Sequence, residues 1–514
     1  MKFRNPVIPG FYPDPSICRV GEDYYLVNSS FEFFPGVPLY HSRDLISWEQ
    51  IGHVLTRKSQ LPLEGCPNSG GIFAPTIRYH EGRFYMVTTN VTGGGHFFVW
   101  TDDIRGEWSD PVWVKQMGID PSLFWDDDGK VYFQSTFFDK KTGRQCIGQS
   151  EIDLETGALL TETRPLWFGT GGKCPEGPHL YKRNGVYYLM IAEGGTEYGH
   201  METLARSRNV WGPFESCPHN PIVTQRDFMP DYTDPTSDVI QGVGHADLVD
   251  DPKGNWWLVF HGFRPSQSML HHIGRETMVA PVEWDSDGWL TVNGGKPITP
   301  VMELPGGDGF LPQTDFSFSE DFTKESTLPA RWAYLRDPVE EHYHFSDGLV
   351  LTGGDPLEGR GAPTFVGVRQ RQFTGTVTAE AEIFPEDDRQ EAGITVYHTG
   401  EHHYDLVVTC RGGKRVALLR RRVCDLLVES DCVELPESGS LTLQIRSDRL
   451  HYEFFAGAAD GELQSLGKAR TQPLSTEVMA GTFTGCFFGM FAQGEGTKAV
   501  FSAFSCNYQE GNEK

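Results

Sequence analysis

Three carboxylates lie at equivalent places in a repeated motif, and residues placed in this way can share one pocket. The clearest copy is FYPDPSICRVGEDYY, where an aspartate precedes a short apolar block and a tight glycine turn. In the five copies, the position of that aspartate holds Asp14, Ala74, Asp120, Gly177 preceded by Glu176, and His245. Two carboxyl groups across a pocket, one protonated and one ionised, are the minimum requirement for acid–base cleavage of a glycosidic bond. Asp14, Asp120 and Glu176 therefore predict hydrolysis of a sugar linkage.

A third carboxylate has a physical use in such a pocket. A nearby negative charge raises the pKa of a carboxylic acid, which keeps that acid protonated near neutral pH. Glu176 is the best acid candidate, because its side chain is longer and its neighbours Pro175, Gly177 and Pro178 carry no charge. A single aspartate before proline usually caps a turn or a strand. Three carboxylates at equivalent repeat positions favour a site instead.

The same repeats predict the scaffold that positions these residues. Each copy has the pattern of a strand, a tight glycine turn and a second strand, and the copies recur every few dozen residues. Repeats of this kind are typical of a β-propeller with one blade per copy, so five copies predict five blades. If each copy begins the innermost strand of its blade, Asp14, Asp120, Glu176 and His245 all face one end of a central channel.

Alternating aromatic and aliphatic runs predict an all-β chain with two domains. Residues 1–305 contain the repeats and are predicted to form the five-bladed β-propeller. Residues 306–320 are rich in proline and glycine and are interpreted as a linker. Residues 321–514 show the short, regular strand spacing of a β-sandwich, without a catalytic constellation.

Composition limits the partners and the compartment. The formal net charge of −26 repels nucleic acid and anionic membrane surfaces. The ten cysteines lack paired spacing, which argues against a zinc site and a compact disulfide framework. No apolar run has the length of a signal peptide or a membrane span. We therefore expect a soluble cytoplasmic protein, unless a signal peptide has been removed.

An ordered set of motifs resembles glycoside hydrolase family 43, specifically the β-xylosidases with an additional C-terminal β-sandwich of the concanavalin-like jelly-roll type. The motifs are NPVIPGFYPDPS, NSGGIFAP, IDPSLF, EGPHLY, EGGTEYGH, GHADLV and GRET. The resemblance implies an inverting hydrolase acting on chains that contain xylose or arabinose. It implies that Asp14 is the general base, Asp120 modulates the pKa and orientation of the acid, and Glu176 is the general acid. Inversion requires the acid and base to be roughly 6.5 to 9.5 Å apart.

The resemblance also implies a set of substrate-binding residues, namely Phe31, Phe73, Thr196, His245, Arg275 and Phe483. Aromatic rings can stack on a sugar, and an arginine can donate paired hydrogen bonds to hydroxyls. Read without the resemblance, Phe31 and Phe73 fit a hydrophobic core, and Arg275 fits a structural salt bridge equally well. His245 fits a hydrogen-bonded pocket histidine, a ligand of a cation in the channel, or a core histidine. Phe483 belongs to the second domain, so a loop of that domain would have to reach the mouth of the propeller.

One departure from the family concerns the segment IFAPTI, where Phe73 and Thr76 replace the usual tryptophan and aspartate. The main hypothesis is an exo-acting hydrolase that releases xylose from the non-reducing end of β-1,4-xylo-oligosaccharides, with α-L-arabinofuranosidase side activity. The alternatives are a main α-L-arabinofuranosidase activity and a non-catalytic carbohydrate-binding propeller. No cofactor is expected to be required, although a divalent cation such as calcium in the channel stays open, and the resemblance implies a homo-oligomer.

Overall fold

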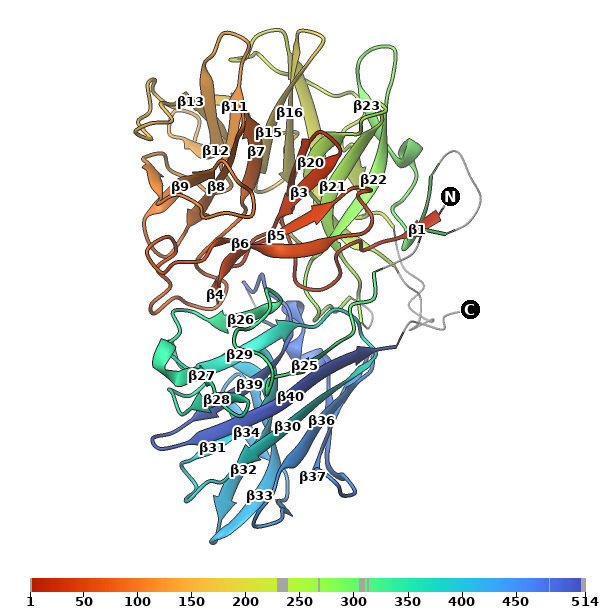
Figure 1. The fold of residues 1–514 in the computed structure, drawn as a ribbon. Helices are drawn as coiled ribbons and strands as arrows, with labels where there is room; N and C mark the ends of the chain where they lie inside the picture. Colours follow the sequence, from red (N-terminus) through yellow and green to blue (C-terminus); the bar gives the residue numbers. More distant parts are fainter. Residues whose placement is uncertain are drawn as a thin grey trace.

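Two all-β bodies are stacked on each other in the computed structural model, a propeller formed by the first part of the chain and a sandwich formed by the last (Figure 1). The structure describes residues 2–228, 239–266, 269–304, 310–311, 314–479 and 481–509. Part of the segment predicted to be a linker, 306–320, lies outside these residues. The predicted fold class, a five-bladed β-propeller followed by a β-sandwich, is confirmed.

Each of the five sequence repeats forms one antiparallel sheet whose strands follow chain order. The first blade contains β2 (Ser16–Val20), β3 (Asp23–Val27), β5 (Gly36–Ser42) and β6 (Glu49–Leu55). The second contains β7 (Thr76–His80), β8 (Arg83–Asn90), β9 (Gly95–Thr101) and β10 (Val112–Val114). The third contains β11 (Ser122–Trp125), β12 (Val131–Asp139), β13 (Arg144–Glu151) and β14 (Arg164–Trp167).

The last two blades complete the ring. The fourth contains β15 (Glu176–Arg183), β16 (Val186–Glu193), β17 (Met201–Ser207), β18 (Glu215–Ser216) and β19 (Val223–Thr224). The fifth contains β20 (Gln241–Asp250), β21 (Trp256–Phe263), β22 (Glu276–Trp284) and β23 (Leu290–Val292). The ring closes where β2 lies against β20, and there Arg19 donates to both carboxylate oxygens of Asp250 at 2.9 Å. At the N-terminus, β1 (Lys2–Arg4) pairs with β24 (Val301–Glu303).

The sandwich consists of two antiparallel sheets. The outer sheet contains β25 (Phe318–Asp321), β27 (Tyr343–Phe345), β28 (Leu349–Thr352), β30 (Gly375–Ile383), β36 (Leu441–Ser447), β37 (His451–Ala458), β38 (Gln464–Arg470) and β40 (Lys498–Tyr508). The inner sheet contains β26 (Trp332–Leu335), β29 (Thr364–Arg369), β31 (Glu391–Thr399), β32 (His402–Arg411), β33 (Lys414–Val423), β34 (Leu426–Glu429), β35 (Val433–Glu434) and β39 (Phe487–Gln493). A strand of the propeller part, β4 (Phe33–Phe34), extends the inner sheet by pairing with β26.

Burial patterns show which sheet faces the propeller. In β30 buried and more exposed residues alternate, as expected for a sheet with one solvated face. In β31, by contrast, every residue is buried, because one face packs in the sandwich core and the other packs against the propeller. The shared core between the domains includes Phe11, Phe33 and Phe487, and the last two rings stack with centroids 4.1 Å apart.

Helix is almost absent from the described residues. Its representatives are four short 3₁₀ turns, η1 (Asn293–Gly295), η2 (Glu340–His342), η3 (Gln472–Leu474) and η4 (Thr476–Val478). None of the helices in the described ranges is long and apolar enough to cross a membrane. All ten cysteines are free.

Candidate active site

The polar residues at the heads of the repeats share a backbone conformation. The φ angle is positive at Asp14 (52°), Asp120 (55°), Gly177 (56°) and His245 (51°), whereas Ala74 does not share it. A left-handed backbone costs a non-glycine residue about 1 kcal/mol or more and persists only where the surroundings fix it. The three non-glycine residues are therefore held in place, Asp14 and Asp120 just before their inner strands and His245 within β20.

Glu176 enters the site one residue earlier than the other heads. At Gly177 an added Cβ atom would lie 2.9 Å from Nε2 of His245, so a side chain there has no room. The pairing of β15 with β16 shifts register between Glu176 and His179, and that of β20 with β21 shifts between Gly244 and Asp247. Such bulges redirect side chains next to functional sites. Here they bring Glu176 and His245 into the same space.

Asp14 is buried and strongly hydrogen-bonded. Its side chain is 5% exposed. Oδ2 accepts a hydrogen bond from Ser29 Oγ at 2.6 Å, and Oδ1 accepts one from Arg275 Nη1 at 2.7 Å. Burial by itself would raise the pKa of Asp14, but Arg275, His245 and His261 outweigh it and hold that pKa well below its ordinary value. Asp14 is therefore an ionised carboxylate.

A histidine and a threonine complete the surroundings of Asp14. Nδ1 of His261 accepts the backbone N–H of Asp14 at 3.1 Å, and burial lowers the pKa of His261 to about 3. Nδ1 of His261 also lies 3.1 Å from Asp14 Oδ1, and its Nε2 lies 3.3 Å from Thr196 Oγ1. Thr196 Oγ1 also accepts from Arg275 at 2.9 Å. Because Arg275 donates to it, the partly exposed Thr196 hydroxyl can donate its own proton to a ligand.

Arg275 connects the two domains at this point. Besides Asp14 and Thr196, it donates from Nη2 to the backbone oxygen of Phe483 at 3.2 Å. Its guanidinium carbon lies 5.9 Å from the ring centroid of Phe31 and 5.8 Å from that of Phe483. The structure thus places Arg275 in a buried salt bridge with Asp14, and the same side chain binds the backbone of the sandwich loop at Phe483.

Asp120 and Glu176 form an acidic pair. Burial, followed by the charge of Asp14, raises the pKa of Glu176 to about 7. Burial, followed by the charges of Glu176 and Asp14, also raises the pKa of Asp120. Two such groups titrate together, and the pair retains a proton up to about neutral pH. Glu176 is partly exposed whereas Asp120 is buried, so Glu176 is the member that can deliver this proton to a ligand.

His245 lies next to Asp14 and is buried. Its Nδ1 is 3.6 Å from Asp14 Oδ1, and burial lowers its pKa, so the ring is neutral. Within the ranges that the structure describes, no group of three or more His, Cys, Asp or Glu residues could hold a metal ion.

Three aromatic rings from both domains meet beside Arg275. The Phe31 ring lies 5.2 Å from that of Phe73 and 6.0 Å from that of Phe483, which it stacks against. Phe31 is buried in the core between the domains, whereas Phe73 and Phe483 are partly exposed. The backbone N–H of Phe483 donates to Ser69 Oγ at 2.9 Å, which ties the sandwich loop to the propeller. The loop predicted to reach the propeller does so.

The structure therefore brings all nine predicted residues together, and it adds two that sequence reasoning missed. Ser29, two residues after β3, and His261, near the end of β21, both contact Asp14 from the second strands of their blades. The sequence did contain a signal for His261, namely the HG pair at the end of the strand WWLVFHG. In a hairpin this end of the strand lies opposite the GHAD motif, and in the structure His261 pairs with Gly244 of that motif.

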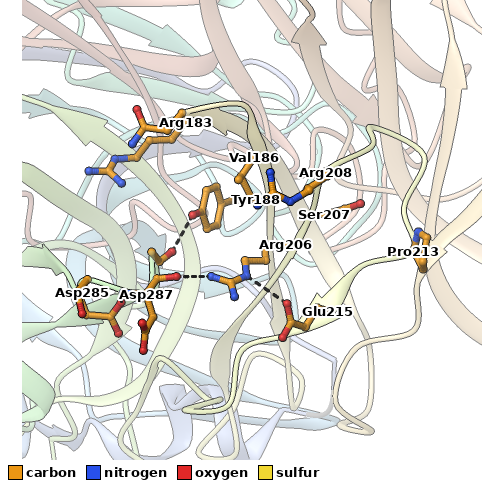
Figure 2. A pocket seen from close by; sticks show the side chains of 13 residues that line it. Arg183, Val186, Tyr188, Arg206, Ser207, Arg208, Pro213, Glu215, Asp285 and Asp287 are labelled. Atoms are coloured by element: carbon orange, nitrogen blue, oxygen red, sulfur yellow. Dashed lines mark hydrogen bonds and ion pairs between the residues drawn. The ribbon is translucent and has the colours of Figure 1, made fainter.

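A separate cavity of about 660 Å³ lies between the fourth and fifth blades at the opposite end of the propeller (Figure 2). It is lined by the far ends of β15, β16 and β17 and contains none of the predicted site residues. Its walls are already joined to each other, since Arg206 donates to Glu215 and to the backbone oxygen of Asp287, and Tyr188 donates to the backbone oxygen of Gly288 (Figure 2).

Comparisons with known proteins cover both domains. Residues 3–290 match the model for glycosyl hydrolases family 43, and residues 319–507 match that for the beta xylosidase C-terminal concanavalin A-like domain. A non-reducing end alpha-L-arabinofuranosidase of Bacteroides ovatus is 41% identical, covering 96% of this chain and 92% of its own. A xylosidase/arabinosidase of Butyrivibrio fibrisolvens is 37% identical, covering 96% of each chain. The crystal structure of a xylan beta-1,4-xylosidase from Bacillus halodurans superposes with a TM-score of 0.90 at 33% identity, covering 98% of this chain and 100% of that one.

Proposed function

Because the chain belongs to glycosyl hydrolases family 43, and is therefore a glycoside hydrolase, we propose that it releases xylose from the non-reducing end of β-1,4-xylo-oligosaccharides with inversion. The observation that carries the proposal is the opposite electrostatic tuning of two carboxyl groups in one pocket. The pKa of Asp14 is held well below its ordinary value and that of Glu176 is raised to about 7. Near neutral pH the pocket thus contains a ready base and a ready acid.

In the proposed reaction, Asp14 removes a proton from a water molecule as that water attacks the anomeric carbon. Glu176 donates its proton to the oxygen of the leaving sugar as the glycosidic bond breaks. Asp14 ends protonated and Glu176 ends ionised, and exchange with solvent restores both. Asp120 accepts the backbone N–H of Gly177, the residue after the acid, and so orients the segment that carries Glu176.

The exo mode of cleavage is supported by the contribution of the second domain. Phe483 and its backbone oxygen form part of the pocket wall, through the Arg275 hydrogen bond and the stacking on Phe31. A wall on this side favours binding of a chain end over binding in mid-chain. Phe73 and Phe483 present partly exposed rings that can pack on the apolar face of a sugar.

The second candidate is a main α-L-arabinofuranosidase activity, which the name of the Bacteroides ovatus relative favours. An α-arabinofuranosyl and a β-xylopyranosyl group present similar hydroxyl patterns, so one pocket can accept both. We propose the xylosidase activity as the main one and the arabinofuranosidase activity as secondary.

The test is hydrolysis of an aryl β-xyloside and an aryl α-arabinofuranoside, with the first-formed anomer followed by NMR. We expect turnover of both, faster on the xyloside, and α-xylose as the first product. β-Xylose as the first product would rule out inversion, and a strong preference for the arabinofuranoside would favour the second candidate.

A further inference from the structure

We propose that Arg78 is a positioning residue, which joins the inner strands of the blades directly beneath the catalytic carboxylates and so fixes the distance between acid and base. The inference rests on the proposed function. The second blade supplies Ala74 at its repeat head and hence no polar side chain to the site itself. Four residues further along β7, the same blade supplies Arg78 to the channel.

A second ring of polar side chains lies two residues after the repeat heads. Its members are Ser16, Thr76, Ser122, His179 and Asp247, and all five are buried. We call these residues together with Arg78 the lower layer, and the repeat heads the upper layer. Hydrogen bonds among Ser16, Ser122, His179, Asp247 and Arg78 cross from blade to blade, so the lower layer lies inside the ring, close along the chain to the upper layer.

Asp247 is the acceptor at the centre of the lower layer. Its Oδ2 accepts from Ser16 Oγ at 2.7 Å and from the backbone N–H of Ile17 at 3.1 Å, both in the first blade. Its Oδ1 accepts from Tyr181 of the fourth blade at 2.5 Å and from the backbone N–H of Leu248. Asp247 belongs to the fifth blade, so this single carboxylate joins three blades.

Arg78 adds the second blade and reaches the fourth again. Nη1 donates to Asp247 Oδ2 at 2.7 Å and to Ser16 Oγ at 3.2 Å. Nη2 donates to Asp247 Oδ1 at 3.2 Å and to His179 Nδ1 at 2.9 Å. Ser122 of the third blade also lies 3.2 Å from His179 Nδ1. Arg78 and its acceptors therefore form one hydrogen-bond network. This network connects β2 and β11, the inner strands that follow Asp14 and Asp120, with β15, the inner strand that begins at Glu176.

The consequence for catalysis is geometric. Asp14, Asp120 and Glu176 come from three different blades, so no local structure fixes the distances among them. Each lies two or three residues from a member of the lower layer. Misplacement of a catalytic group by about 1 Å can lower the rate by about 100-fold. Loss of the paired hydrogen bonds from the Arg78 guanidinium should therefore reduce kcat without removing any group that contacts the sugar.

The experiment compares Arg78→Met and Arg78→Lys with Arg19→Met, as folded proteins with matching near-UV circular dichroism. Arg19 forms a paired contact with Asp250 at the junction of the first and fifth blades but farther from the site, so it controls for general joining of blades. For Arg78→Met on an aryl β-xyloside we expect kcat about 100-fold lower with KM within about threefold. Arg78→Lys keeps the positive charge but loses the two-pronged hydrogen bonding of the guanidinium group, so we expect its kcat to be about 10-fold lower. Arg19→Met should leave kcat unchanged.

A folded Arg78→Met variant with kcat within about threefold of wild type would overturn the proposal. If that variant does not fold, Arg78→Lys decides, and wild-type kcat there would overturn the proposal equally. Inactivity of the wild type toward both glycosides would contradict the proposed function alone. Crystal structures then decide the role of Arg78: displaced Asp14 and Glu176 in Arg78→Met support it, and unmoved carboxylates overturn it.

Discussion

Two aspartate–arginine pairs, each with a buried carboxylate, occupy the upper and lower layers, and their carboxylates differ in how many hydrogen bonds they already accept. Arg275 donates to Asp14 in the upper layer, and Arg78 donates to Asp247 in the lower layer, both at 2.7 Å. In both pairs burial raises the pKa of the aspartate, but the arginine together with other neighbours outweighs burial and lowers that pKa. Asp247 is fully buried and accepts from four neighbours besides Arg78, whereas Asp14 is 5% exposed and borders the pocket. The same type of pair therefore joins blades in the lower layer, whereas in the upper layer its carboxylate is the proposed base.

Replacing each aspartate by asparagine should separate these two roles and give the largest effects. Asp14→Asn removes the general base, so we expect kcat to fall by about 10³-fold to 10⁴-fold. Its stability should fall less than that of Asp247→Asn, because Asp120 and Glu176 no longer feel the Asp14 charge and can ionise near Arg275 in its place. Asp247→Asn leaves Arg78 without its counter-charge, which should cost about 3–5 kcal/mol of unfolding free energy.

Denaturant unfolding and kcat, measured on both variants, check this comparison. Asp247→Asn should lose stability with a smaller loss of kcat than Asp14→Asn. An Asp14→Asn variant that loses as much stability as Asp247→Asn, yet keeps most of its turnover, would show that the two pairs have the same structural role.

The upper layer was largely predictable from the sequence, and the lower layer was not. Repeat heads share a position along the chain, so alignment of five motifs is enough to place Asp14, Asp120, Glu176 and His245. Arg78 has no such signature in the sequence. Its role depends on its contacts with other blades across the channel, and alignment of the repeats does not give the arrangement of the blades. Gly177 shows the same limit of sequence reasoning. The repeats align it with Asp14 and Asp120, but they do not reveal that His245 leaves room only for glycine at this position, because that contact arises from three-dimensional packing.

The aromatic wall was predictable only through family resemblance. Phe31 and Phe73 follow the pattern of core residues, and Phe31 is in fact buried in the core between the domains. Phe483 is 208 residues from Arg275 and 414 residues from Ser69 along the chain, and nothing in its local sequence indicates a pocket. Contact between separate domains is not encoded in local periodicity, which is why the strands were easier to predict than their mutual arrangement.

The acid of the upper layer can be tested through leaving groups and pH. Glu176→Gln should lower kcat/KM by about 10²-fold to 10⁴-fold on xylobiose, whose leaving group needs a proton, and far less on an activated aryl xyloside. The acid works while protonated, so wild-type activity should fall as pH rises through about 7, the raised pKa of Glu176. That alkaline fall should disappear in Glu176→Gln with the activated substrate. Equal losses on both substrates would count against Glu176 as the acid.

The wall supplied by the sandwich should have a smaller effect. Phe483→Ala removes a ring that stacks on Phe31 but leaves the backbone oxygen that accepts from Arg275. An aromatic contact of this kind contributes about 1 kcal/mol, so we expect kcat/KM on xylobiose to fall about fivefold, mainly through KM. Phe384→Ala, at an exposed phenylalanine of the same domain, is the matched control and should change nothing. Unchanged kinetics in Phe483→Ala would place the ring outside the sugar site.

The smallest effect should come from removing metal ions. The channel beneath His245 already contains a cation of the protein itself, because the Arg78 guanidinium bonds to Asp247 and His179 in the lower layer. A divalent ion at that level would meet this positive charge, and no cluster of three acidic, histidine or cysteine ligands exists in the described residues to compensate. We therefore expect dialysis against a chelator to leave kcat and KM unchanged. If the chelator instead abolishes activity and added calcium restores it, His245 binds a cation above Arg78. The upper layer would then need a positive charge that Arg78 in the lower layer does not supply.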